Sequence, residues 1–171
     1  MASTVVDTPI GPLSLIAGAA GLVRVGFGPV ASVADPGGGA VAQAHVALAG
    51  NELEEYFAGR RRVFTVALDR SSRSGFRGAA LAALEQVPYG ELVTYGELAV
   101  LAGRPGAARA VGSAMATNPL PIVVPCHRVT RSGHIGGYGP GVATKEWLLR
   151  LEGSLPVPPA SGGRRLSPPA R

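Results

Sequence analysis

The spacing of apolar and polar positions changes along the chain and predicts β structure first, then helices. Three short apolar runs within residues 3–27, separated by Gly and Pro turns, predict β-strands. Over residues 43–58 the apolar side chains recur at helical spacing and the glutamates fall off that stripe, which predicts an amphipathic helix ending at Gly59. The run over residues 63–68 predicts one further short strand.

The middle of the chain has the pattern of short helices joined by tight turns. An Ala/Leu-rich run predicts a helix over residues 76–87. Thr94 followed three residues later by Glu97 is a capping-box signature and predicts a helix of about two turns. Pro105 suits the first turn of another helix, which we expect over residues 105–117. A short helix, a tight turn and a second helix together predict a helix-turn-helix.

The end of the pattern contains one more helix and an aperiodic tail. A Gly-rich loop precedes the predicted helix, which covers residues 142–151. The tail that follows is rich in proline and has no periodicity, so we expect it to be disordered. The patterns predict an N-terminal α/β domain at 1–69, a linker at 70–75, a mostly helical domain at 76–153 and the tail at 154–171.

Charge is distributed unevenly, and the distribution favours a polyanionic partner. The chain has 171 residues and a formal net charge of +5. Residues 1–69 hold four arginines and six acids, whereas residues 70–153 hold nine cations and five acids and residues 154–171 hold three arginines. A basic second half is typical of proteins that bind nucleic acid. A compositional bias toward Ala, Gly, Arg and Pro is the alternative explanation.

The remaining bulk features indicate a soluble cytoplasmic protein. No apolar stretch reaches the roughly 20 residues that a membrane-spanning helix needs. The N-terminus lacks the basic start and apolar run of a secretion signal. A single unpaired thiol suits a reducing compartment.

The only cysteine, Cys126, is the strongest candidate for chemistry. His127 follows it directly, and the apolar run before it predicts a short buried strand. One cysteine excludes an internal disulfide and leaves a buried structural residue or a nucleophile with a lowered pKa. Neighbours on a strand face opposite sides, so His127 would act through a water or a bend. Glu152 is the best candidate to orient the imidazole, with an ordinary surface acid as the alternative.

The second helix of the predicted helix-turn-helix consists mostly of small residues around one long cation, Arg109. Small side chains allow the helix backbone to approach a partner surface closely. Close packing against another helix would need the same residues, so both uses remain open.

Motifs over most of the second half resemble those of the O6-alkylguanine-DNA alkyltransferases, the methylated-DNA–protein-cysteine methyltransferases. The similarity is specific over residues 76–153 and weaker in residues 8–13, and order and spacing both fit. The matching segments are Pro125-Cys126-His127-Arg128-Val129, Val87-Pro88-Tyr89-Gly90-Glu91, Thr94-Tyr95-Gly96, Ala107-Ala108-Arg109-Ala110-Val111-Gly112, Asn118-Pro119 and Lys145-Glu146-Trp147-Leu148-Leu149.

This resemblance implies an α+β fold and direct-reversal DNA repair. The N-terminal α/β domain would be ribonuclease-H-like, and the mostly helical C-terminal domain would carry the helix-turn-helix. The partner would be double-stranded DNA containing alkylated guanine, bound through its minor groove with the base flipped out. The alkyl group of O6-alkylguanine would pass irreversibly to Cys126, once per molecule. The resemblance implies no cofactor and no metal, and we expect a monomer; activity on O4-alkylthymine stays open.

The resemblance also implies roles for individual residues. Arg109 would fill the gap in the duplex, and Tyr95 would assist extrusion and donate a hydrogen bond to guanine N3. His127, held by Glu152, would act on Cys126 through a water. Asn118 would order the active-site turn, and the carbonyls of Cys126 and Val129 would read the guanine amino group. The catalytic set is Cys126, His127, Glu152, Asn118 and Tyr95; the DNA-binding set is Arg109, Tyr95, Thr94, Ala108, Ala110 and Gly112; the base-pocket set is Tyr95, Met115, Val129, Tyr138 and Gly139.

Some positions depart from the family pattern. Gly139 stands where some relatives have Ser, so only a backbone N–H could contact O6 there. Residues 74–81 are smaller and less aromatic than usual, and the N-terminal domain lacks the cysteines of the zinc site of some relatives. Three alternatives remain: a non-catalytic binder of alkylated DNA, a cysteine hydrolase with turnover, and a methylation-dependent regulator, which would need a further domain.

Overall fold

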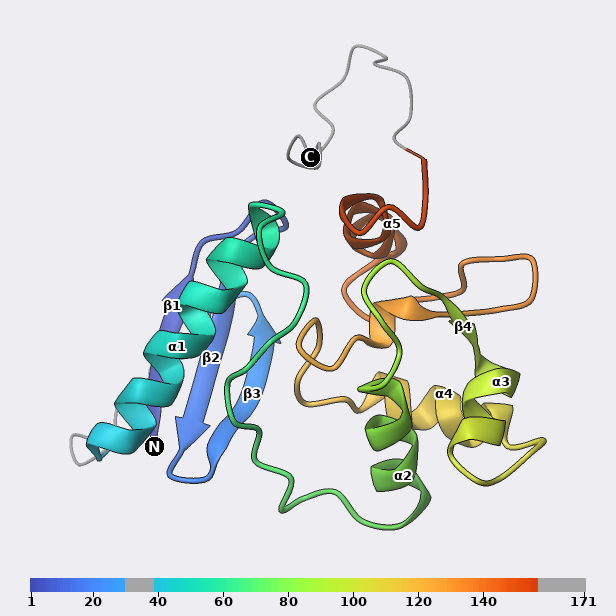
Figure 1. Cartoon of the computed structure of the whole chain (residues 1–171), viewed down its shortest axis with the longest axis horizontal. Helices are drawn as coiled ribbons and strands as arrows, with labels where there is room; N and C mark the ends of the chain where they lie inside the picture. Colours follow the sequence, from blue (N-terminus) through green and yellow to red (C-terminus); the bar gives the residue numbers. More distant parts are fainter. Residues whose placement is uncertain (30–38, 157–171) are drawn as a thin grey trace. The chain divides into compact units, whose positions relative to one another are not determined.

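The computed structural model describes residues 1–29 and 39–156, and the chain divides into two compact units (Figure 1). The first unit extends to Arg70 and the second begins at Ser71. The Gly- and Pro-rich sequence of residues 28–40 predicts a loop, and most of that segment and of the predicted tail at 154–171 lies outside the described residues. Within the described part of that tail, the backbone N–H groups of Ser154 and Leu155 donate to the carbonyl of Leu149, at 2.9 and 3.3 Å.

The first unit is a three-stranded antiparallel sheet with one helix packed on it (Figure 1). The strands β1, β2 and β3 lie in sequence order, as expected for short strands joined by tight turns. Alternate residues of β2 are completely buried, as are Ala49 and Leu53 on the helix, so the core lies between helix and sheet. These elements are β1 (Ala2–Val6), β2 (Leu13–Gly18), β3 (Gly21–Phe27) and α1 (Ala40–Phe57).

The prediction of a strand over residues 63–68 is wrong. Only Leu68 pairs with the sheet, through an isolated parallel bridge to Leu22. The backbone approaches the sheet too closely for a side chain at Gly21, where a Cβ atom would lie 2.3 Å from the carbonyl oxygen of Ala67. Residues 63–68 therefore touch the sheet at one point and do not add a strand to it.

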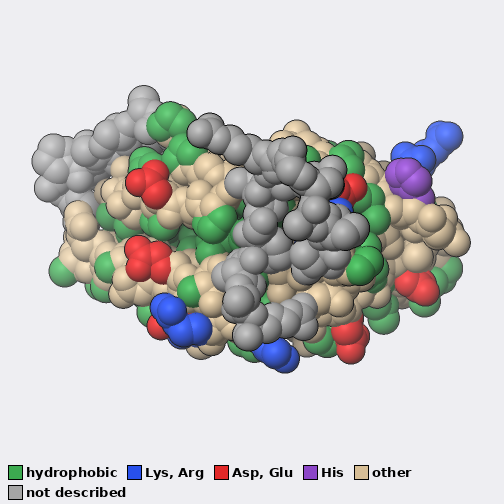
Figure 2. Space-filling model, turned by 90° about the horizontal axis from the view of Figure 1, so that it is seen from above, with side chains coloured by type: hydrophobic (Ala, Val, Ile, Leu, Met, Phe, Trp, Pro, Cys, Tyr) green, Lys and Arg blue, Asp and Glu red, His purple; other side chains and the backbone are tan. Residues whose placement is uncertain are grey.

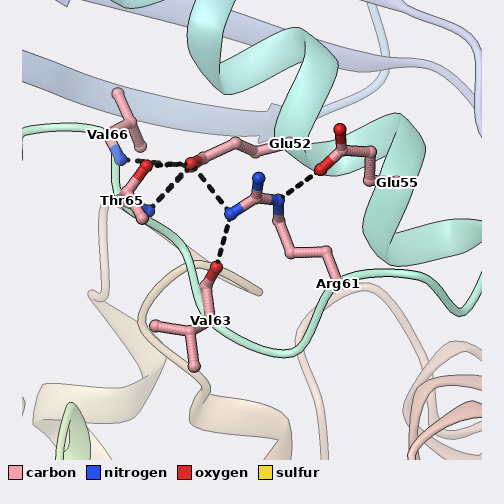
Figure 3. A network of polar contacts seen from close by, with 6 residues as sticks. All are labelled: Glu52, Glu55, Arg61, Val63, Thr65 and Val66. Atoms are coloured by element: carbon pink, nitrogen blue, oxygen red, sulfur yellow. Dashed lines mark hydrogen bonds and ion pairs between the residues drawn. The ribbon is translucent and has the colours of Figure 1, made fainter.

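A buried carboxylate replaces the missing strand pairing. Glu52, on α1, is 1% exposed and accepts hydrogen bonds from the backbone N–H of Thr65 at 2.9 and 3.0 Å and of Val66 at 3.1 Å (Figure 3). The Thr65 hydroxyl donates to the same carboxylate, and Arg61 forms an ion pair with it at 3.2 Å. These bonds satisfy backbone donors that a strand would have paired in a ladder.

The second unit is mostly helical, and α2, α3 and α4 pack on one another (Figure 1). The predicted helices over 76–87 and 142–151 are present, the first ending three residues early. A short parallel strand pair, β4 with β5, joins the start of α3 to the segment after Cys126. The elements are α2 (Gly75–Leu84), β4 (Val93–Thr94), α3 (Tyr95–Leu101), α4 (Ala108–Ala116), the 3₁₀ turn η1 (Cys126–Arg128), β5 (Val129–Thr130) and α5 (Val142–Leu151).

In the helix-turn-helix, the first helix begins where the sequence predicts, but the second helix does not. The Thr94 hydroxyl accepts from the Glu97 N–H at 3.1 Å and the Glu97 carboxylate accepts from the Thr94 N–H at 2.8 Å, which forms the capping box. The second helix begins at Ala108 and not at Pro105. Gly106 has φ +83°, a left-handed conformation that a right-handed helix cannot include, so the turn extends three residues further than the proline suggested.

Candidate active site

Cys126 lies at the start of η1 and is buried, with 7% of its surface exposed. The prediction of a strand before it is wrong. The segment bends instead, and Ile122 has φ +73°, the only positive φ at a non-glycine residue within 1–29 and 39–156. Side chains advance by about 120° per residue in a 3₁₀ turn. Cys126 and His127 are therefore not held on opposite faces as they would be on a strand.

Asn118 holds the bend in front of the thiol. Its amide nitrogen donates to the Val124 carbonyl at 2.8 Å, and its amide oxygen accepts from the Leu120 N–H at 3.1 Å. The side chains of Asn118 and Tyr138 also lie beside Cys126, where both favour its thiolate form. One side chain thus fixes the backbone of the bend and contacts the sulfur.

The surroundings of Cys126 have opposing effects on its ionisation. Burial has the largest effect and raises the pKa of the thiol above its usual value, whereas the side chains of Asn118 and Tyr138 and the positive charge of Lys145 lower it. Burial also raises the pKa of Tyr138 well above its usual value, and the neighbouring sulfur adds to this shift. Tyr138 therefore stays protonated beside the sulfur.

Lys145 is a member of the site that the sequence patterns did not single out. It is completely buried on α5, and its ammonium donates to the carbonyls of Val129 at 2.6 Å and Gly137 at 3.2 Å. Burial lowers the pKa of Lys145 to about 8, and the charge of Cys126 opposes that shift. The lysine therefore links the residues after the thiol to the loop that contains Tyr138.

A buried cluster of charged and polar side chains joins η1 to the end of α5. Its members are His127, Arg128 and Glu152. His127 Nε2 lies 2.8 Å from Glu152 Oε1, and the guanidinium of Arg128 donates to both carboxylate oxygens at 2.9 Å. Arg128 also donates to the carbonyl of Val87 at 2.6 Å. Burial alone would raise the pKa of Glu152, but the charges and hydrogen bonds of His127 and Arg128 outweigh it and hold that pKa well below its usual range.

This cluster rules out one of the two explanations that the sequence left open for Glu152, and it adds Arg128 to the site. Glu152 is 3% exposed and is not an ordinary surface acid. Arg128 was not assigned a role, because arginines are mostly exposed and its neighbours in the sequence do not indicate a buried ion pair. The other ring nitrogen, Nδ1 of His127, is buried and has no hydrogen-bond partner among the described residues.

Tyr95 approaches the same site from the start of α3 and is half-buried. Burial raises its pKa, the positive charge of Arg131 lowers it, and the charge of Cys126 raises it. The structure therefore brings Cys126, Asn118, Tyr95 and Tyr138 into one site. Of the other predicted pocket residues, Val129 lies on β5, Met115 is buried on α4 and Gly139 is exposed.

The predicted DNA-binding residues other than Tyr95 lie on α4 or at the start of α3. Arg109 is exposed on α4. Its small neighbours Ala108, Ala110 and Gly112 are half-buried, and Thr94 caps α3. On the face drawn in Figure 2, Lys and Arg side chains stand separately and form no continuous patch.

Two further findings concern metal-binding clusters and membrane-spanning helices. Within residues 1–29 and 39–156, no three His, Cys, Asp or Glu side chains are grouped so that they could hold a metal ion. None of the helices in this part of the chain is long and apolar enough to cross a membrane.

A buried thiol that has an amide, a phenol and a His–Glu pair beside it, and that follows a helix-turn-helix, defines a protein that carries a nucleophile next to a DNA-binding motif. Comparison with known proteins agrees with this class. The 6-O-methylguanine DNA methyltransferase ribonuclease-like domain matches residues 1–70, and the DNA binding domain of the same methyltransferase matches residues 75–154. The chain belongs to the 6-O-methylguanine DNA methyltransferase family.

Individual relatives carry the same designation. A methylated-DNA–protein-cysteine methyltransferase from Methanosarcina acetivorans is 41% identical over 150 residues, which cover 86% of this chain and 96% of that protein. One from Salmonella typhimurium is 48% identical over 106 residues, which cover 61% of this chain and only 62% of the relative. The crystal structure of Mycobacterium tuberculosis OGT in complex with DNA has a TM-score of 0.76 and 40% identity, and the match covers 89% of this chain and 92% of that one.

Proposed function

We propose that this protein repairs alkylated guanine in DNA by direct reversal, with Cys126 as the irreversible acceptor of the alkyl group. The observation that carries the proposal is the buried Cys126 itself, which has the side chains of Asn118 and Tyr138 beside it and is adjacent to the His127–Glu152 pair. A cysteine buried only for packing would not need polar groups that favour its thiolate.

The proposed reaction is a single displacement. The thiolate of Cys126 attacks the alkyl carbon on O6, so that a sulfur–carbon bond forms as the carbon–oxygen bond breaks and its electron pair stays on guanine. Tyr95 donates a hydrogen bond to guanine N3 and stabilises the departing base. His127, with Glu152 on one ring nitrogen, has Nδ1 available for a water that takes the thiol proton. The net products are a thioether and guanine, and the thiol proton ends on the base.

The proposed partner is double-stranded DNA containing alkylated guanine. The Mycobacterium tuberculosis relative was crystallised in complex with DNA, which supports the same partner for this chain. We place α4 in the minor groove, with Arg109 filling the gap left by the flipped nucleotide. The small residues Ala108, Ala110 and Gly112 would permit the close approach. The Tyr138–Gly139 loop, with Met115 and Val129, would enclose the base.

The chain would act once and without a cofactor, because a thioether is a poor leaving group and the alkyl donor is the DNA itself. We place the reaction in the cytoplasm, whose reducing conditions suit a single free thiol, and expect a monomer. We propose residues 76–153 as the domain that binds DNA and carries the reaction.

The test is to incubate the protein with a duplex containing O6-methylguanine and to measure intact and peptide masses. We expect one added methyl group per molecule, on the peptide that contains Cys126, and none in Cys126→Ser. Turnover beyond one equivalent would indicate a hydrolase, and binding without any mass change would indicate a non-catalytic binder. Either result would contradict the proposal.

A further inference from the structure

Arg131 lies beside Tyr95 because of the strand pairing next to the thiol. The parallel pair β4–β5 aligns Val93 with Val129 and Thr94 with Thr130. Tyr95, the first residue of α3, and Arg131 each directly follow one of the paired strands. Both residues therefore start from the same end of the strand pair.

A tight turn then keeps the side chain of Arg131 at this position. The Arg131 N–H donates to the His134 carbonyl at 2.8 Å, and the His134 N–H donates back at 3.1 Å. His134 Nδ1 accepts from the Gly136 N–H at 2.9 Å, which folds Gly136 back toward the strand. A Cβ atom on Gly136 would lie 3.6 Å from both Arg131 Cγ and Tyr95 Cε2. The arginine stem and the tyrosine ring edge thus flank one buried glycine.

The guanidinium of Arg131 has no ion-pair partner in the described part of the chain. Its side chain is exposed and makes no hydrogen bond or ion pair within residues 1–29 and 39–156, whereas Arg128, three residues earlier, is committed to Glu152. Two charged groups act on the Tyr95 phenol: Arg131, from the turn, lowers its pKa, and Cys126, from η1, raises it. A cation beside a phenol makes the O–H a better hydrogen-bond donor.

We propose that Arg131 is a positioning residue of the transfer reaction, which polarises Tyr95 so that its hydroxyl donates more strongly to the departing guanine. This inference rests on the proposed function, in which Tyr95 contacts guanine N3. Negative charge develops on guanine as the bond to O6 breaks, so a stronger donor at N3 stabilises the transition state more than the ground state. Arg131 gives up no proton; it acts only through the phenol.

The first experiment follows the phenol without any substrate. Tyrosines labelled with ¹³C at Cζ are titrated by NMR, and the Tyr95 signal is assigned with Tyr95→Phe. We expect the pKa of Tyr95 to rise in Arg131→Gln and to return toward the wild-type value in Arg131→Lys, because the effect depends on charge. The matched control is Arg24→Gln, which removes an exposed arginine in the first unit. A Tyr95 pKa that is the same in Arg131→Gln and wild type would overturn the proposal.

The second experiment measures alkyl transfer with two substrates. We expect Arg131→Gln to react about two- to fivefold more slowly with both free O6-benzylguanine and an O6-methylguanine duplex, as for a partly exposed charge interaction. If only the duplex reaction slows, Arg131 contacts the phosphate backbone and the proposal is wrong. If wild type transfers nothing, the proposed function fails, whereas the NMR result still decides whether Arg131 acts on Tyr95.

Discussion

Lys145 joins the two segments that surround the thiol, and its charge is the one full positive charge that lowers the Cys126 pKa. The ammonium donates to Val129 and Gly137, so it is held in place by backbone on both sides. Its own pKa of about 8 lies close to physiological pH, because burial disfavours the charged form. The protonation of Lys145 and that of Cys126 are therefore linked.

Lys145→Met should raise the pKa of Cys126, since it removes a positive charge from a buried site. The measurement is the rate of Cys126 alkylation by iodoacetamide as a function of pH, with Cys126→Ser as the blank. We expect the midpoint of the profile to move to higher pH. Arg150→Met, on the solvent side of the same helix, is the control and should leave the midpoint unchanged. An unshifted profile in Lys145→Met would show that the lysine only fills space.

Single residues of the site were predictable to different degrees. Cys126, His127 and Asn118 lie close together in the sequence, so a local motif identifies them. Arg128 and Lys145 were missed because cations are mostly exposed, and only packing between distant segments decides when one is buried. Their partners, the carbonyls of Val87, Val129 and Gly137, carry no side-chain signal at all.

The end of α5 shows how one helix depends on its tertiary partners. Glu152 is the C-cap residue of α5, where the helix dipole disfavours a carboxylate. Arg128 compensates by an ion pair with the carboxylate, and His127 adds a hydrogen bond to it. Because the folded pKa of Glu152 lies below the ordinary value of 4.5, its contribution to stability is complete above that pH and is lost as the pH falls below it.

Glu152→Gln should destabilise the protein by about 3 kcal/mol at pH 7, because it leaves Arg128 buried without its counter-ion. Urea unfolding at pH 7 and pH 4 tests this. The difference between variant and wild type should be smaller at the lower pH, where the wild-type carboxylate begins to lose its advantage. Glu146→Gln is the matched control, since that half-exposed acid pairs with Arg150 on the same helix and should cost less than about 0.5 kcal/mol. Equal losses in both variants would contradict this account.

The success of sequence prediction also differed among elements. α3 and α5 were predicted correctly, because a capping box and a clear apolar stripe are local signals. The strand over 63–68 was predicted wrongly, because the backbone N–H groups of Thr65 and Val66 donate to the Glu52 carboxylate and not to a neighbouring strand. The start of α4 was missed because Gly106 takes a left-handed conformation, and a proline alone does not reveal it.

For the molecule as a whole, the division into two units means that stability and reactivity can be perturbed separately. The Glu52 network lies entirely in the first unit, and the residues around Cys126 lie entirely in the second. The mixed α+β fold that the family resemblance implied is confirmed, and the two family matches fall on either side of the boundary between the units.

Glu52→Gln should lower the stability of the first unit by about 1–3 kcal/mol, because it weakens several buried hydrogen bonds at once. Hydrogen exchange of the Thr65 and Val66 amides measures the effect directly, and both should exchange faster. The transfer rate with free O6-benzylguanine should not change. Glu55→Gln, which removes the other, more exposed partner of Arg61, is the control and should leave these amides protected (Figure 3). Protection of both amides in Glu52→Gln would refute the role of the carboxylate.

The left-handed Ile122 has a consequence for anyone who wishes to transplant the reactive loop. A β-branched residue at φ +73° costs of the order of 1–3 kcal/mol, so the bend is not the conformation that this stretch would choose in isolation. The amide of Asn118 and the burial of Ile122, which is 1% exposed, hold it there. A synthetic peptide with the same residues around Cys126 would relax and lose the arrangement. The reactivity is therefore not portable as a short motif, and a grafted version would have to include the scaffold that keeps this one residue in its unfavourable geometry.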